Sequence, residues 1–169
     1  EQLEGALAMI EGKVVEMRTG EGKTFVAVFA AAWHALSKSG VHVITANAYL
    51  VERDSQEMAP VYQALGLSVG CVLPEQTAVA KQAAYACDVT YGTSTEFGFD
   101  RLRDQLVDRP EEQVQRLQFA AVVDEVDGLL IDEARTPLVV SGSAQPAKDT
   151  YARFHALAQR FSNNGPAPH

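Results

Sequence analysis

The chain has 169 residues, of which 47% are hydrophobic and 21% are charged, a composition that predicts about one folded domain. Its 14 basic and 22 acidic residues give a formal net charge of −8, which disfavours a protein that binds nucleic acid through a broad basic face. The sequence contains no apolar run that reaches the roughly 18 residues of a membrane-spanning helix.

Apolar runs of strand length alternate along the chain with longer stretches of helical character. In chain order, the predicted strands are residues 14–17, 41–45, 68–73, 89–91 and 119–123, and the predicted helices are residues 23–37, 49–65, 75–86 and 95–106. This alternation predicts an α/β fold in which a mostly parallel sheet is covered by helices on both faces. Beyond the last strand we expect an extended run at 137–141, a helix at 147–160 and a frayed tail at 162–169.

Aromatic and thiol side chains give further expectations about the core. Phe25, Phe29 and Trp33 recur at helical spacing within the first predicted helix, so we expect them to be core residues. Cys71 and Cys87 do not have the spacing of a metal site, and we expect them to be buried, reduced thiols.

The segment Arg-Thr-Gly-Glu-Gly-Lys-Thr lies between the first predicted strand and the first predicted helix. Gly20 and Gly22 allow the backbone to curl around an anion, Lys23 would reach the β- and γ-phosphates, and the hydroxyl of Thr24 would hold Mg²⁺. The general phosphate-loop pattern has a glycine where this chain has Met17, so the loop fits the Thr-Gly-x-Gly-Lys-Thr variant of helicase-like motors better. The predicted nucleotide-binding residues of the loop are Arg18, Thr19, Gly20, Glu21, Gly22, Lys23 and Thr24.

A phosphate loop needs an acidic partner for Mg²⁺ at the end of another strand. Asp124 and Glu125 directly follow the apolar run 119–123, and the carboxyl ends of parallel strands meet at one edge of a sheet. We expect Asp124 to hold the ion and Glu125 to orient and polarise the attacking water. A second acid pair, Asp132 and Glu133, follows a shorter apolar run that begins with glycine, and we expect it to form a solvated turn or a hinge ion pair.

Four segments together resemble the first nucleotide-binding domain of SecA, the bacterial preprotein translocase ATPase. They are residues 16–24, 41–54, 90–104 and 122–142. The resemblance extends over roughly residues 1–145 and implies a three-layer P-loop NTPase fold of the RecA-like motor type. It places a motor domain at 1–145 and a helix with a frayed tail, the start of a truncated or inserted region, at 146–169.

The resemblance also implies roles for residues at matching positions. Gln2 matches a glutamine that reads the adenine edge, because an amide can pair bidentately with adenine. Asp124 and Thr24 match the residues that hold Mg²⁺, and Glu125, Lys23 and Asp124 match the catalytic residues. ATP is therefore the implied substrate and Mg²⁺ the implied cofactor.

The family resemblance implies a larger machine than this chain. Preproteins and a SecY-type membrane channel are the implied partners, and the implied location is cytoplasmic, at the inner face of the membrane. We expect the chain to be a piece of a longer protein, without the second motor domain and its arginine finger, and therefore to bind nucleotide but hydrolyse it poorly. Departures from the usual family pattern at Ala48, Ser94, Thr95 and Arg101 leave two alternatives open, a housekeeping translocase and a divergent or accessory relative.

Two other functions fit parts of the sequence. A DEAD-like nucleic-acid helicase shares the motor fold, but Arg101, Arg103, Arg109 and Arg116 lie among acidic residues, so we expect no nucleic-acid binding. A nucleotide-binding interaction module without turnover is the other alternative, and the intact set of predicted catalytic residues disfavours it for the longer protein.

Overall fold

The computed structural model describes residues 1–117 and 119–140. Within them the elements are α1 (Gln2–Ile10), α2 (Lys23–Ala35), β1 (Val41–Thr45), α3 (Ala48–Ala64), β2 (Val69–Cys71), α4 (Ala78–Tyr85), β3 (Val89–Thr93), α5 (Ser94–Asp104), a 3₁₀ turn η1 (Pro110–Glu112), β4 (Ala120–Val123) and a π-helical turn η2 (Gly128–Asp132). All of these belong to one compact unit, Glu1–Leu138. The predicted helix at 147–160, the tail at 162–169 and residue 141 lie outside the described residues.

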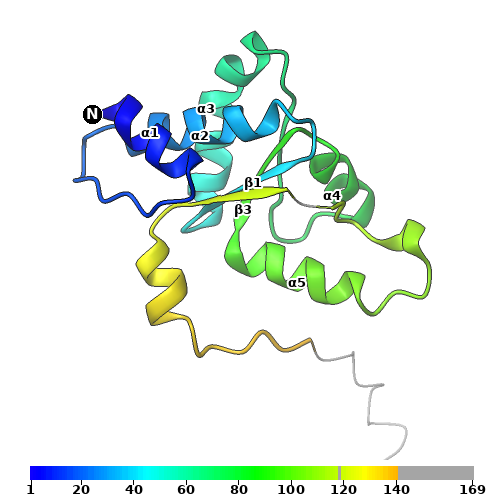
Figure 1. Ribbon diagram of the computed structural model, residues 1–169. Helices are drawn as coiled ribbons and strands as arrows, with labels where there is room; N and C mark the ends of the chain where they lie inside the picture. The colour runs from blue at the N-terminus through cyan, green and yellow to red at the C-terminus, as the bar shows by residue number, and fades with distance from the viewer. Residues whose placement is uncertain (118, 141–169) are drawn as a thin grey trace, which may run out of the picture. The chain divides into compact units, whose positions relative to one another are not determined.

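The four strands form one parallel sheet in the order β2-β3-β1-β4. Parallel neighbours must be joined by crossovers, and here each crossover contains a helix (Figure 1). None of the helices in the described ranges is both long and apolar enough to cross a lipid bilayer. The predicted α/β fold with a parallel sheet is therefore confirmed.

Both faces of the sheet are covered, because successive strand residues point to opposite sides. On one face Val43 of β1 and Val122 of β4 join a buried cluster with residues of α2 and α3. On the other face Ile44 packs against a second cluster that includes Tyr85 of α4 and Phe97 of α5. The three layers of helices, sheet and helices follow from this alternation.

Local hydrogen bonds fix where the helices at the carboxyl edge begin. The side-chain oxygens of Asn47, Thr77 and Thr93 accept bonds from the amides three residues later, at 2.9, 3.3 and 3.2 Å, at the starts of α3, α4 and α5. Such caps satisfy amides that have no partner within the helix. The start of α5 is therefore fixed directly after the last residue of β3.

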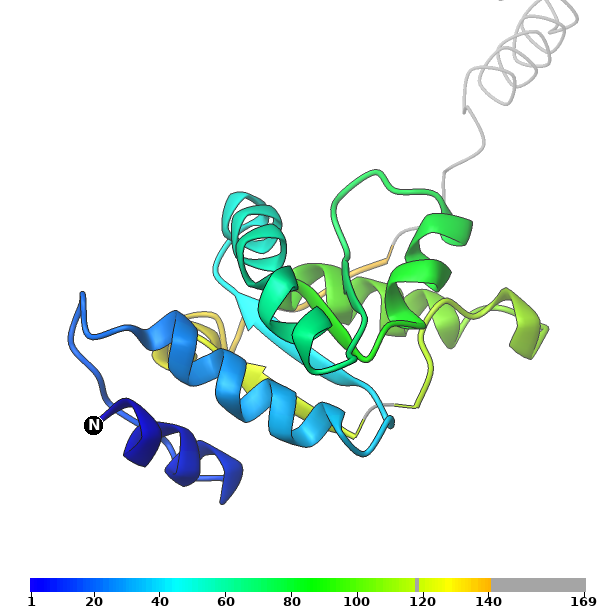
Figure 2. The same cartoon turned by 90° about the horizontal axis from the view of Figure 1, so that it is seen from above.

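The first predicted strand is wrong, and a helix before it was missed. Residues 14–17 form no strand, and their alternating side chains instead face α1: Val15 and Met17 both approach the position of Gly5. Helix α1 lies alongside α2 (Figure 2) and contains this glycine, which lowers its helix propensity. A period-two apolar run thus packs against a helix instead of pairing with the sheet.

The expected role of the aromatic residues of α2 is also wrong. Phe25, Phe29 and Trp33 are 49%, 53% and 61% exposed, and together with Leu36 they form an outer apolar stripe on the helix. The opposite side of α2 is buried through small residues, namely Val26, Val28, Ala30, Ala31, Ala32 and Ala35. These let the helix approach the sheet closely, and spacing alone does not tell which of two apolar stripes is the buried one.

The two cysteines are free, as expected, but they are only half-buried, so their expected burial is wrong. Cys71 ends β2, and Cys87 lies in the loop between α4 and β3. Burial raises the pKa of the Cys87 thiol above its usual value.

Candidate nucleotide-binding site

A cavity of about 460 Å³ opens where the amino end of α2 faces the carboxyl ends of β1 and β4. Lys23 and Thr24 line it from the first turn of α2, and Asp124 and Glu125 line it from the end of β4. These four residues are separated by about a hundred positions in the sequence, so the fold brings together the two halves of the predicted site. A helix amino end supplies unpaired amides and a positive dipole, which together favour an anion.

The other predicted loop residues lie beside the cavity and do not line it. Gly20 and Gly22 both have left-handed backbone angles, with φ of 87° and 83°. At Gly22 a side chain is disfavoured because φ is positive, and a Cβ there would also displace the side-chain amide of Gln2. The amide of Arg18 donates to the carboxylate of Glu21 at 2.8 Å, so this loop already holds an anionic group with a backbone N–H.

Gln2 lies against the same loop. Its Nε2 donates to the carbonyl oxygen of Glu21 at 3.2 Å, which joins the start of α1 to the phosphate loop. Gln2 is exposed, and so are Arg18 and Thr19. The predicted contact of Gln2 with adenine stays a prediction.

Glu125 has an uncommon backbone conformation. Its φ is 52°, in the left-handed region that non-glycine residues rarely occupy, and its amide donates to Oδ1 of Asp124 at 3.0 Å. The amide of Asp124 in turn donates to the carbonyl of Ile44 at 2.9 Å, which extends the β1–β4 pairing by one residue. Strained backbone of this kind costs about 1–3 kcal/mol and is concentrated at functional sites.

The second acid pair lies apart from the main cavity. Asp132 ends η2 and Glu133 follows it, and both are exposed, as a solvated turn would be. Glu133 lines a smaller cavity of about 170 Å³, which Thr45, Asp124 and Glu125 also line. The acid pair that lines the same cavity as the phosphate loop is therefore Asp124 and Glu125.

The oxygen ligands in the cavity suit a Mg²⁺ ion that is shared with bound phosphate better than a metal ion held by protein side chains alone. Residues 1–117 and 119–140 contain no group of three or more histidine, cysteine, aspartate or glutamate side chains placed to hold a metal ion. Mg²⁺ in nucleotide sites keeps several waters and takes one or two protein ligands together with phosphate oxygens. The hydroxyl of Thr24 and the carboxylate of Asp124, which line the same cavity, fit that coordination.

Comparison with known proteins decides the family. The model of the SecA DEAD-like domain matches residues 1–167. The chain belongs to the SecA DEAD-like domain family. Protein translocase subunit SecA 1 of Nitrosospira multiformis is 53% identical over 160 residues, which cover 95% of this chain and 17% of that relative. The resemblance to SecA is thereby confirmed, and the chain spans about a sixth of the length of this relative.

A further buried acid, Asp54, lines the cavity of this SecA DEAD-like domain, and it belongs to a segment that the family resemblance places along the cleft. Asp54 on α3 is only 6% exposed. Its Oδ1 accepts a hydrogen bond from Nε of Arg53 at 2.8 Å and forms an ion pair with Nη2 of Arg53 at 2.6 Å. Near it, burial raises the pKa of Tyr91 to about 12, and the negative charge of Asp54 adds to that rise. The resemblance of residues 41–54 to the family implied that Arg53 and Asp54 line the cleft, and of these two Asp54 lines the cavity.

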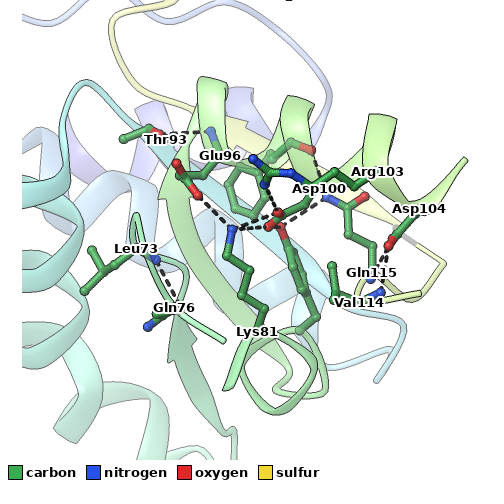
Figure 3. A network of polar contacts seen from close by, with 12 residues as sticks. Leu73, Gln76, Lys81, Thr93, Glu96, Asp100, Arg103, Asp104, Val114 and Gln115 are labelled. Atoms are coloured by element: carbon green, nitrogen blue, oxygen red, sulfur yellow. Dashed lines mark hydrogen bonds and ion pairs between the residues drawn. The ribbon is translucent and has the colours of Figure 1, made fainter. Parts of the chain in front are cut away.

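A buried polar network fixes α5 beside the site (Figure 3). Nζ of Lys81 on α4 donates to Glu96 at 2.8 Å and to both oxygens of Asp100 at 2.7 and 2.9 Å. Tyr85 donates to Asp100 at 2.9 Å and Arg103 donates to it at 3.1 Å. Because α5 starts at Ser94, which lines the smaller cavity, this network holds one wall of the site.

Proposed function

We propose that this SecA DEAD-like domain binds Mg²⁺-ATP and provides the phosphate-binding and water-activating residues of a protein-translocating ATPase. The convergence of Lys23 and Thr24 with Asp124 and Glu125 on one cavity supports the proposal. The relative from Nitrosospira multiformis is a protein translocase subunit, which supports the coupling to protein transport.

Each residue then has a distinct task in phosphoryl transfer. Lys23 binds the β- and γ-phosphate oxygens, and the amides at the start of α2 add further donors. Thr24 and Asp124 would hold Mg²⁺, which would neutralise charge on the phosphates. Glu125 would orient a water for attack on the γ-phosphorus and accept its proton. The bond between the water oxygen and phosphorus forms while the bond to the ADP leaving oxygen breaks.

The charges around the cavity make the bound metal necessary for tight binding. Its acidic lining residues are Glu16, Asp54, Asp124, Glu125 and Asp127. Lys23 is the single Lys or Arg among the lining residues that the structure describes. A metal-free triphosphate would meet net negative charge here, so we expect nucleotide binding to depend strongly on Mg²⁺.

In the longer protein we propose that ATP binding and hydrolysis move a preprotein through a SecY-type channel at the cytoplasmic face of the membrane. A second motor domain would close on the nucleotide and supply an arginine finger. We expect no functional nucleic-acid binding, because Arg103 pairs with Asp100 and Arg116 donates to the carbonyl of Cys87. Strong, salt-sensitive binding of RNA or DNA would contradict this part of the proposal.

Calorimetry of Mg²⁺-ATP and Mg²⁺-ADP binding to the chain tests the proposal directly. We expect the wild-type chain to bind both nucleotides and Lys23→Ala to bind them at least about tenfold more weakly, because a charge-assisted phosphate contact is lost. Lys13→Ala is the matched control, since Lys13 is an exposed lysine that pairs with Glu11 outside the cavity. A folded wild-type chain that binds neither nucleotide would refute the proposal.

A further inference from the structure

Thr45, the last residue of β1, has a buried hydroxyl without a partner. The residue is 5% exposed. Among the residues that the structure describes, Thr45 Oγ1 and Arg116 Nε are the buried side-chain atoms that make no hydrogen bond. Leaving a buried hydroxyl unpaired is unfavourable, and valine would fill the same space in a strand without that penalty. The hydroxyl therefore calls for a partner that is not part of the chain.

The sheet register places Thr45 beside Asp124. In the β1–β4 pairing Val43 lies opposite Val122 and Ile44 opposite Val123, so Thr45 and Asp124 are the next pair. Alternation along each strand puts these two side chains on the same face as Val43 and Val122, the face that α2 covers. The hydroxyl and the predicted metal-binding carboxylate are thus neighbours across two strands.

The two cavities meet at the same place. Thr45, Asp124 and Glu125 line both the cavity of about 460 Å³ and the one of about 170 Å³, and no other described residue lines both. The larger cavity also receives Lys23 and Thr24. Thr45 thus lies at the junction where water, phosphate and metal would come together.

We propose that Thr45 is a positioning residue whose hydroxyl hydrogen-bonds a water of hydrated Mg²⁺ held by Asp124. The inference rests on the proposed function, because it assigns a further residue to the same site. A water bound to Mg²⁺ is a strong donor, and Thr45 Oγ1 has free acceptor capacity. Thr45 would thereby help Asp124 hold the ion in the orientation that the phosphates require.

Two variants, Thr45→Val and Thr45→Ser, test this in the same chain. Nucleotide binding is measured by calorimetry with Mg²⁺ and with EDTA, and thermal unfolding is measured without ligand. We expect Thr45→Val to weaken Mg²⁺-ATP binding about tenfold, to leave metal-free binding unchanged and to raise the Tm by about 3 °C, because an unpaired hydroxyl is removed. Thr45→Ser keeps the hydroxyl, and we expect it to restore Mg²⁺-dependent binding.

The outcomes separate this inference from the proposed function. If Thr45→Val binds Mg²⁺-ATP as the wild-type chain does, the inference is overturned while the proposed function stands. If Thr45→Val lowers the Tm and weakens binding equally with and without Mg²⁺, the residue is only structural and the inference is again overturned. If the wild-type chain does not bind Mg²⁺-ATP, both fail together.

Discussion

His42 shows how one buried side chain can set the pH response of the fold. It is 7% exposed, and its ring stacks on Phe97 with 4.1 Å between ring centroids. Burial, and to a smaller degree the charge of Arg116, lowers its pKa from 6.5 to about 4. The folded protein therefore keeps His42 neutral over a range in which the unfolded chain is protonated.

We expect this histidine to make the protein less stable in mild acid. As the pH falls, the unfolded state takes up a proton on His42 before the folded state does. The stability that the neutral His42 contributes is therefore fully present above about pH 6.5 and is lost as the pH falls toward 4. His42→Phe removes this titrating group, so the acid-induced loss in the free energy of unfolding should be smaller by about 3 kcal/mol in the variant. Urea denaturation of both proteins at several pH values measures this, and equal pH profiles would show that His42 is not responsible.

At the scale of elements, the packing of α4 against α5 depends on one lysine, Lys81. Lys81, Glu96 and Asp100 have side chains that are 7%, 16% and 2% exposed, so the ion pairs between them are largely withdrawn from water. Removal of one partner from a buried pair leaves charges without compensation. The ion pairs of Lys81 with Glu96 and Asp100 also fix the start of α5 next to the smaller cavity.

We expect Lys81→Met to lower the free energy of unfolding by about 3–5 kcal/mol, because two carboxylates lose their shared cation. The control is Lys38→Met, which removes the exposed partner of Asp88, where the lysine side chain is 57% exposed. That change should cost no more than about 1 kcal/mol. Similar losses for both variants in chemical denaturation would argue against a special role for the buried network.

The sequence predicted where most helices and strands lie, but it did not predict which element each one packs against. The strand at 41–45 has the predicted bounds, since its apolar run is buried on both faces of the sheet. The run at 14–17 has a similar pattern but packs on α1, and only the tertiary structure distinguishes the two. For the same reason the loop and the acid pair were identified from local motifs, and the family resemblance pointed to Arg53 and Asp54. Thr45 became visible only through the cavity that it lines.

At the scale of the whole molecule, the chain corresponds to 17% of the length of its SecA relative. In the longer protein we propose that a second motor domain closes over the cavity and supplies an arginine finger. In related enzymes an arginine finger accelerates phosphoryl transfer by about 10³–10⁵. The binding step and the chemical step should therefore be separable in this protein.

We expect the chain to bind Mg²⁺-ATP but to hydrolyse it only slowly, and Glu125→Gln to remove the remaining turnover without weakening binding. The physical reason is that glutamine keeps the shape of the side chain but does not accept the proton of the attacking water. Single-turnover phosphate release measures the rate. Release at a rate typical of a complete motor, or an unchanged rate in the variant, would contradict these assignments.

The outer stripe of α2 also gives the protein an optical reporter. Trp33 is the single tryptophan of the sequence and is 61% exposed. It lies ten residues along α2 from Lys23, about 15 Å at the helical rise per residue, so it is attached to the helix that we propose binds phosphate but is remote from the proposed ligand position. A segment that covers the stripe in the longer protein would exclude water from the indole and shift its emission to shorter wavelength. One fluorescence spectrum would thus register assembly separately from nucleotide binding.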